Sequence, residues 1–349
     1  MLRKVDTGLE AEKDRFRTYY SEKLCGDYVG LEPIRKKYLR QCGVRMAVGF
    51  VAAGLYYACC VMRNVSAEVI FSNNVLGIYV VFISFFGLWA RKPCVWYQKD
   101  SKRLVMDKIL AFWGDVHYSA SSESDIPAED LRKSGLFGNF EDRKAADEFK
   151  GVYKGAEVIV SEQCLTRTVH MREGSREAMV FNGIVIKLKL AKKIAGQTVV
   201  RSDRGWFNFM ISALRGGRKE FANGTVVESI FIKSMQQNVK LEDPVFEREW
   251  EVYATDQIEA RYILTPALME RMLEIKRRFG GKSIEFSFFD NQALIAVRTN
   301  KDMFETTSLF TPSLSYCRVQ EVVAQFYSIF SAIGLLQGAE YERAVSVQQ

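Results

Sequence analysis

The chain has 349 residues, of which 48% are hydrophobic and 26% charged, as expected for a folded protein of one sizeable domain with additions. Its net charge of +7 is moderate and its basic clusters flank apolar segments, which argues against nucleic-acid binding, since that needs a concentrated basic stripe on a folded face. Seven cysteines without a C-x-x-C pair exclude a regular disulfide framework, and two isolated histidines argue against a zinc site.

The first 43 residues are rich in charged side chains. We expect a cytoplasmic N-terminal arm over residues 1–43 that is helical in places, with Pro33 as a break, because proline removes a helical hydrogen bond.

Two uncharged runs follow, over residues 46–62 and 69–90. Crossing the hydrocarbon core of a bilayer takes roughly 20 helical residues, with a range of 17–25. The alternative is a pair of buried core helices, but such helices normally keep a polar face, and these runs carry few polar side chains. The sequence therefore predicts transmembrane helices at about 44–62 and 69–90. The linker of about six residues predicts an antiparallel hairpin.

Basic residues lie on the outer sides of both runs. Arg35, Lys36, Lys37, Arg40 and Arg45 precede the first, and Arg91, Lys92, Lys99, Lys102 and Arg103 follow the second. The positive-inside rule therefore predicts a multi-pass protein with both termini in the cytoplasm and the lipid bilayer as its first partner.

Residues 100–148 form a predicted connector. Apolar residues at helical spacing from Val105 to Val116 predict an amphipathic helix, which docks either on the soluble domain or on the membrane surface. The polar stretch 119–130 predicts a loop, with Pro127 starting a short helix.

From about Phe149 the pattern favours strands. The predicted strands are 157–161, 178–190, 198–201, 226–233 and 250–254, with a less regular stretch over 205–224. Thr265 and Pro266 are typical of a helix start and predict a helix over 266–278. Residues 283–289 and 293–298 predict a β-hairpin, and 318–336 a last packed helix. The sequence thus predicts an α+β domain with a largely antiparallel sheet over 149–338, followed by a tail over 339–349.

No motif specifies an enzyme. Gly281-Lys282-Ser283 lacks the spacing and the strand-to-helix order of a phosphate loop. The acidic cluster over 242–256 has basic neighbours available and is typical of a solvated face. His170 has no nucleophile at a recognisable spacing. We therefore assign no catalytic, cofactor-binding or metal-binding residue and no cofactor; enzymatic activity stays open, with the balance against it.

The soluble part resembles DUF3137, a bacterial family of unknown function. The resemblance rests on residues 149–165 and 181–200, and above all on LEDPVFEREWEVYATDQIEARYILTPALMERMLEI at 241–275. It continues in 126–137 and 284–297 and covers roughly 100–335, with Asn182 departing from the expected bulkier or charged residue. The resemblance implies a bacterial inner-membrane location and an N-terminal transmembrane pair. It supplies no catalytic residues and suggests a LemA-type membrane protein as a partner.

These observations predict a membrane-tethered interaction or scaffold protein with a protein partner in the membrane or cytoplasm, or a homo-oligomer. The block around Asp256, Glu259 and Arg261 is the candidate contact surface, although Asp256 and Arg261 could instead form a structural ion pair. The alternatives are a membrane-associated enzyme of unrecognised type and a subunit of an oligomeric transport assembly.

Overall fold

The computed structural model describes residues 7–62, 73–171, 174–190, 194–202, 237–280, 283–299 and 302–347. Its helical elements are α1 (Thr7–Tyr19), the π-helical η1 (Tyr20–Leu24), α2 (Cys25–Met62), α4 (Asn73–Leu110), α5 (Ala128–Lys133), α8 (Pro244–Glu249), α9 (Gln257–Ile263), α10 (Pro266–Arg278) and α11 (Tyr316–Val347). Its strands are β1 (Asp115–Ser119), β2 (Asp142–Tyr153), β3 (Ala156–Met171), β4 (Gly174–Lys189), β5 (Thr198–Ser202), β6 (Gln237–Asn238), β7 (Trp250–Ala254), β8 (Ile284–Phe289) and β9 (Gln292–Arg298). The chain divides into two compact units, residues 1–109 with 304–323 and residues 110–303 with 324–349.

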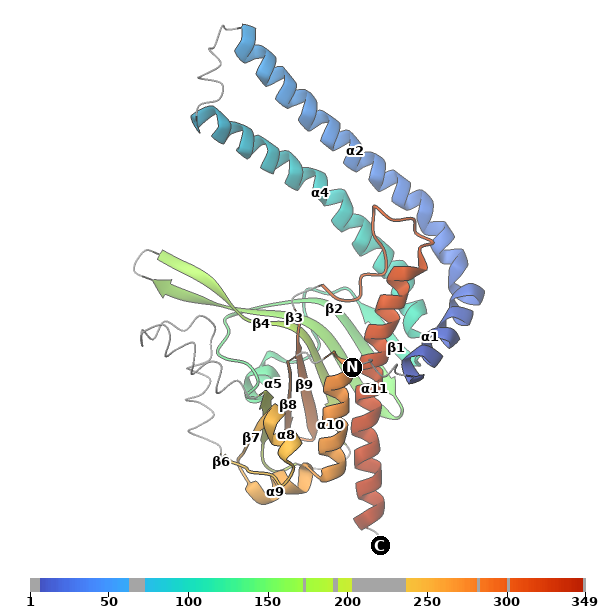
Figure 1. Cartoon of the computed structure of the whole chain (residues 1–349), viewed down its shortest axis with the longest axis vertical. Coiled ribbons are helices and arrows are strands. Elements are labelled where there is room, and N and C mark those ends of the chain that lie inside the picture. The colour runs from blue at the N-terminus through green and yellow to red at the C-terminus, as the bar shows by residue number, and fades with distance from the viewer. Residues whose placement is uncertain are drawn as a thin grey trace. The chain divides into compact units, whose positions relative to one another are not determined.

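The first unit is built on two long helices. α1, η1 and α2 follow one another directly, and α4 runs back along α2 in the opposite direction (Figure 1). The Cys42 thiol donates to the Ala90 carbonyl at 3.4 Å, and the Tyr38 hydroxyl donates to Asp100 at 2.6 Å. Further along, the ring of Phe86 packs against the backbone of Gly49, where an added Cβ would lie 3.0 Å from it. The two helices are therefore packed against each other well beyond their charged ends.

Pro33 does not break the N-terminal arm, contrary to the expectation from sequence, because it lies inside α2. Proline at this position leaves the carbonyl of Val29 without its helical donor. Contacts on both sides of Pro33 hold the helix, since Leu31 is buried and Arg35 donates to the Leu309 carbonyl at 3.0 Å.

The segment 304–315 packs against both long helices. Arg35 of α2 donates to the Leu309 carbonyl at 3.0 Å, and the Tyr97 hydroxyl of α4 lies 3.0 Å from that of Ser313. Lys102 of α4 pairs with Glu305 at 2.7 Å, with both side chains largely buried. This segment follows the strands of the sheet in sequence, but it is part of the first, helical unit.

Two stretches of the described chain are long and apolar enough to cross a membrane, judged by length and composition. In the first, within Leu9–Cys59, 6% of the apolar window is buried, whereas in the second, Tyr316–Gln337, half of it is. Core helices of soluble proteins pass the same test when they are buried. Of these two stretches, the N-terminal one is left largely uncovered by the described part of the chain.

The second unit is an antiparallel sheet with the strand order β1-β2-β3-β4-β9-β8-β5-β7-β6. This confirms the predicted α+β class. The predicted strands 157–161 and 198–201 lie inside the longer β3 and β5, 178–190 overlaps β4, and 250–254 coincides with β7. β2 begins before the predicted onset at Phe149. The predictions for 205–224 and 226–233 lie outside the described residues.

Helices and a loop cover the two faces of the sheet. On one face, Phe326 and Phe330 of α11 pack against Phe149 and Trp113, and the Trp113 and Phe330 rings stack at 5.5 Å. On the other face, a separate core joins the sheet to α5 and the loop around it; its buried members include Ile126, Leu131, Phe137, Phe181, Val185 and Leu294.

Sequence patterns next to the element predicted the position of helix α10 and of the β-hairpin that follows it. The Thr265 hydroxyl accepts from the Leu268 amide at 3.3 Å, and Pro266 takes the first helical position. Asp290 and Asn291 have φ of 45° and 62°, the left-handed conformation that a two-residue hairpin turn requires. Both predictions are confirmed.

The separate amphipathic helix expected over 105–116 does not form. α4 continues through the charged residues after the apolar run and ends at Leu110, and Val116 lies in β1. Most of residues 91–103 are good helix formers, and the Trp89 carbonyl, which Pro93 deprives of its helical donor, accepts from Arg45 instead, so the helix continues. The chain turns at Gly114, whose φ of +141° is open to glycine but rarely to other residues.

Candidate functional site: a basic groove between the long helices

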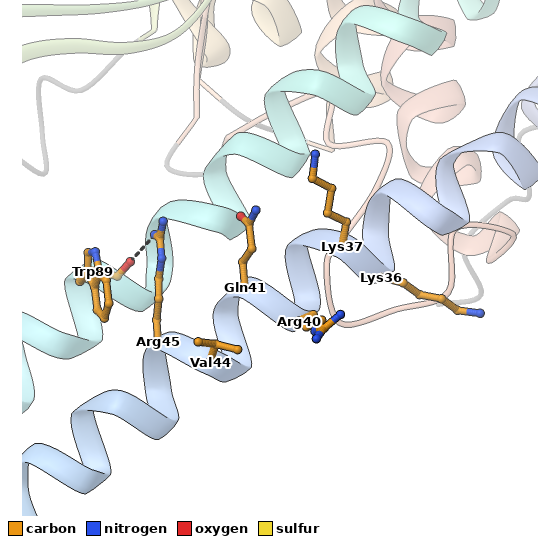
Figure 2. Close-up of a pocket in the computed structure, with 7 residues that line it drawn as sticks. All are labelled: Lys36, Lys37, Arg40, Gln41, Val44, Arg45 and Trp89. Carbon is orange, nitrogen blue, oxygen red and sulfur yellow. Dashed lines mark hydrogen bonds between the residues drawn. The ribbon is translucent and has the colours of Figure 1, made fainter.

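A groove of about 620 Å³ lies beside the charged end of the helix pair. It is lined by Lys36, Lys37, Arg40, Gln41, Val44, Arg45 and Trp89, the last from α4 and the others from α2 (Figure 2). We call it the basic groove. The apolar run of α2 begins at the next residue, Met46.

Helical spacing brings these side chains together. Residues four apart on an α-helix lie on one face, so Lys37, Gln41 and Arg45 form one row and Lys36, Arg40 and Val44 the adjacent row. Figure 2 shows the first row pointing from α2 toward the side of α4, with Lys36 pointing away. The groove therefore has an inner row that meets α4 and an outer, cationic rim.

Arg45 joins the two helices at a carbonyl that proline sets free. Pro93 lies inside α4 and has no N–H, so the carbonyl four residues earlier, that of Trp89, has no helical donor. The Arg45 guanidinium donates to this carbonyl at 2.9 Å. It replaces the missing helical hydrogen bond with one from a cation, which is stronger than a neutral one.

Two indole rings flank the same guanidinium. Its Cζ lies 5.1 Å from the ring centroid of Trp89 and 5.2 Å from that of Trp96. Cations at this distance are attracted to the negative face of an aromatic ring. The hydrogen bond and the two rings fix the position of Arg45 at the inner end of the groove.

The other three cations of the groove are not bound to protein groups in the described part of the chain. Within the described part of the chain, Lys36, Lys37 and Arg40 form no hydrogen bond or ion pair, and all three are exposed. Two carboxylates of the same helices are already engaged, since Glu32 binds Arg35 and Asp100 accepts from Tyr38. The groove thus keeps its positive charge.

Glu32 shows how strongly its carboxylate is held. The Arg35 guanidinium donates to Glu32 at 2.6 and 2.9 Å, and the Ser313 amide donates at 3.1 Å. These bonds favour the charged carboxylate, and the hydrogen bond from Arg35 is the main reason that the pKa of Glu32 falls to about 2. Glu32 is therefore ionised at any physiological pH and stays bound to Arg35.

The oxygen of the Gln41 amide lacks a donor. Its Oε1 atom is buried and accepts no hydrogen bond from the residues that the structure describes. A buried acceptor without a donor is costly, on the order of 1–3 kcal/mol. The groove therefore contains, beside its cations, a buried hydrogen-bond acceptor that has no donor among the described residues.

The residues predicted as a contact surface have local structural roles. The Asp256 carboxylate caps α9, accepting from the Ile258 amide at 2.8 Å, and Glu259 accepts from the amides of Ala195 and Gly196 at 2.8 and 2.6 Å. Arg261 donates to the Lys240 carbonyl at 3.5 Å. An Asp256–Arg261 ion pair is not formed among the described residues. A contact role for these residues stays a prediction.

His170 does meet a hydroxyl, which the sequence did not reveal. Its Nδ1 lies 2.7 Å from Oγ of Ser175 on the neighbouring strand, and both residues are exposed. A serine is activated in an enclosed, preorganised site. This exposed pair on a two-stranded ribbon is not such a site.

Comparison with known proteins places part of the chain in a family. Residues 179–337 match the model described as "Protein of unknown function (DUF3137)". The chain carries a DUF3137 domain. No curated protein matches. Among solved structures, the crystal structure of the mycobacterial trehalose monomycolate transport factor A, TtfA, is similar at 14% identity and a TM-score of 0.30, covering 62% of this chain and 88% of that one.

The DUF3137 match is narrower than the range of 100–335 expected from the resemblance. It begins within β4 and continues to Gln337 in α11, so it includes the segment 304–315 that packs against the long helices. Asn182, which departs from the expected family pattern, donates to the Thr299 carbonyl at 3.2 Å beside Gly183. The basic groove lies outside the matched range.

The sequence singled out the four cations of the groove, as flanking charges, but not Gln41 or Val44 and not the groove itself. The basic run before Met46 served as a topology signal, and its four-residue spacing was available as a second signal that these side chains share a helix face. The role of Arg45 depends on Trp89 and Pro93, which lie more than 40 residues away in the sequence.

Proposed function

We propose that this protein is a membrane-anchored scaffold: a hairpin of two transmembrane helices holds a DUF3137 domain at the cytoplasmic face of a bacterial inner membrane, where the domain binds another protein. The observation that carries the proposal is the packing of residues 304–315, which belong to the matched domain in sequence, against α2 and α4. Anchor and domain are thereby joined by three chain connections, near residues 109, 303 and 323, and not by one linker.

Exposed apolar side chains support the anchor. Phe50 is 72% exposed and Leu55 67% on α2, and Phe85 and Leu88 are 63% and 67% exposed on α4. Exposed apolar surface of this extent marks a membrane or partner contact in a stable protein. Lipid acyl chains would cover these exposed apolar side chains. A helix can cross the hydrocarbon core because its backbone N–H and C=O groups are hydrogen-bonded within the helix.

Charge supports the orientation. The basic residues flank the outer ends of the two runs, and the short linker 63–68 carries one arginine and one glutamate. Lys and Arg are retained on the cytoplasmic side, so both ends are placed inside. The segment 304–315 contacts both helices near these charged ends, which agrees with both ends lying on one side of the membrane.

Crosslinking and affinity capture of the full chain from native membranes test the scaffold. We expect a stoichiometric protein partner, and a LemA-type membrane protein is the first candidate to look for. Extraction of a lone monomer in mild detergent, with no crosslinked species, contradicts the scaffold role.

Cysteine labelling tests the topology. In a chain otherwise free of cysteine, Ser66→Cys should react with an impermeant maleimide added from outside the inner membrane. The native Cys317, which is exposed, should react only after permeabilisation. Equal labelling of both sites from outside contradicts the hairpin.

A further inference from the structure

We propose that the basic groove binds the headgroup of an anionic phospholipid, with the phosphate against the cations and a headgroup hydroxyl on Gln41. This inference rests on the proposed membrane anchor, which places the groove at the depth of the headgroups, and it adds a specific ligand site to that anchor.

Position and charge select the ligand. The groove ends at Arg45 and the apolar run begins at Met46, so in an inserted chain the groove lies in the layer of lipid phosphates. Its lining includes four cations and no carboxylate. An anionic surface attracts each such cation by about 1 kcal/mol. Lys36, Lys37 and Arg40 have no protein partner among the described residues, so they are free to meet an anion.

The shape of the groove and its hydrogen-bonding groups narrow the class of anionic ligand. Val44 and Trp89 supply an apolar wall on the membrane side of the groove, which suits the glycerol and upper acyl region of a lipid. The buried Oε1 of Gln41 needs a donor, and a headgroup hydroxyl supplies one whereas a bare phosphate dianion or a choline group does not. Arg45 is a positioning residue, because its guanidinium is already held by the Trp89 carbonyl and two rings.

Native mass spectrometry of the full-length protein in detergent tests the site with phosphatidylglycerol as the probe. Three preparations are compared: wild type, the triple variant Lys36→Gln/Lys37→Gln/Arg40→Gln, and the matched control Lys92→Gln/Lys99→Gln/Arg103→Gln. The control removes the same charge from exposed positions on α4 that do not line the groove. A fourth variant, Gln41→Leu, removes the acceptor without changing charge.

We expect one retained phosphatidylglycerol per chain in the wild type and in the control, and an affinity lower on the order of a hundredfold in the groove triple variant. Gln41→Leu should lower the preference for phosphatidylglycerol over phosphatidic acid severalfold. Equal retention by both triple variants, or equal retention of phosphatidylcholine and phosphatidylglycerol by the wild type, overturns the proposal. Displacement of the lipid by inorganic phosphate at matched concentration also overturns it, in favour of a free-anion site.

The failure of this inference is distinguishable from that of the proposed function. A chain that stays in the membrane pellet after an alkaline wash but shows no lipid preference refutes only the headgroup site. A chain released by that wash refutes the anchor, and with it the basis for both.

Discussion

Pro93 and Arg45 form a pair whose interaction energy the structure lets us work out. Pro93 deprives the Trp89 carbonyl of its helical donor, and Arg45 supplies one at 2.9 Å. A hydrogen bond from a charged donor contributes roughly 1.5–3 kcal/mol, and an exposed cation–π contact about 0.5–1 kcal/mol. Arg45→Met keeps much of the side-chain bulk but removes both, so we expect it to lower the free energy of unfolding by about 2–4 kcal/mol.

The second substitution isolates the hydrogen bond. Pro93→Ala restores a backbone N–H at position 93, which can bond to the Trp89 carbonyl as in any α-helix. In that background the carbonyl no longer depends on Arg45, so Arg45→Met should cost only the ring contacts, about 1 kcal/mol. The two substitutions should therefore be non-additive by about 1.5–3 kcal/mol, the contribution of the hydrogen bond.

Equilibrium unfolding of the full chain in mixed micelles, followed by circular dichroism at increasing denaturing-detergent fraction, measures the cycle. The matched control pairs Arg45→Met with Pro33→Ala, since Pro33 lies in α2 and frees the carbonyl of Val29 instead. Independent sites add to within about 0.5 kcal/mol. A coupling to Pro93 no larger than the coupling to Pro33 would refute the reasoning.

Three further predictions concern other contacts. The pKa of Glu32 is lowered to about 2, chiefly by the hydrogen bond from Arg35. The ionised Glu32 therefore stabilises the folded protein above the unfolded pKa near 4.5, and this stabilisation is lost as pH falls from there toward 2. Glu32→Gln should flatten the pH dependence of the free energy of unfolding in that window. A Cβ on Gly183, whose φ is +155°, would lie 2.1 Å from the Val297 carbonyl oxygen, so Gly183→Ala should separate β4 from β9 and cost about 3 kcal/mol in denaturant unfolding; a cost below 1 kcal/mol contradicts the close approach. Glu259→Ala leaves two backbone amides without their acceptor and should lower the domain's stability by about 2 kcal/mol, seen as a fall in Tm of several degrees, whereas an unchanged Tm with lost partner capture would indicate a contact role instead.

Local chemistry in the sequence determined the class of fold and several of its elements. The start of α10 follows from Thr265 and Pro266, because a cap acts on amides only two or three residues away. The turn of the β8–β9 hairpin follows from Asp290 and Asn291, which accept the left-handed conformation. The uncharged runs determined where long apolar helices lie, because their length and composition suffice for that conclusion.

Tertiary structure decided how far each element extends and what its side chains do. The charged residues after the second apolar run lie inside α4, and the chain turns only after Leu110, where Gly114 has a φ of +141°. Glu259 looked like a surface residue and instead holds the amides of Ala195 and Gly196, some 63 residues earlier in the chain. Arg45 looked like one of five topology-setting cations, but it also donates to the carbonyl of Trp89, which Pro93 leaves without a helical donor in α4. Charge and periodicity are properties of a segment, whereas the partner of a side chain depends on which distant segment folding brings beside it.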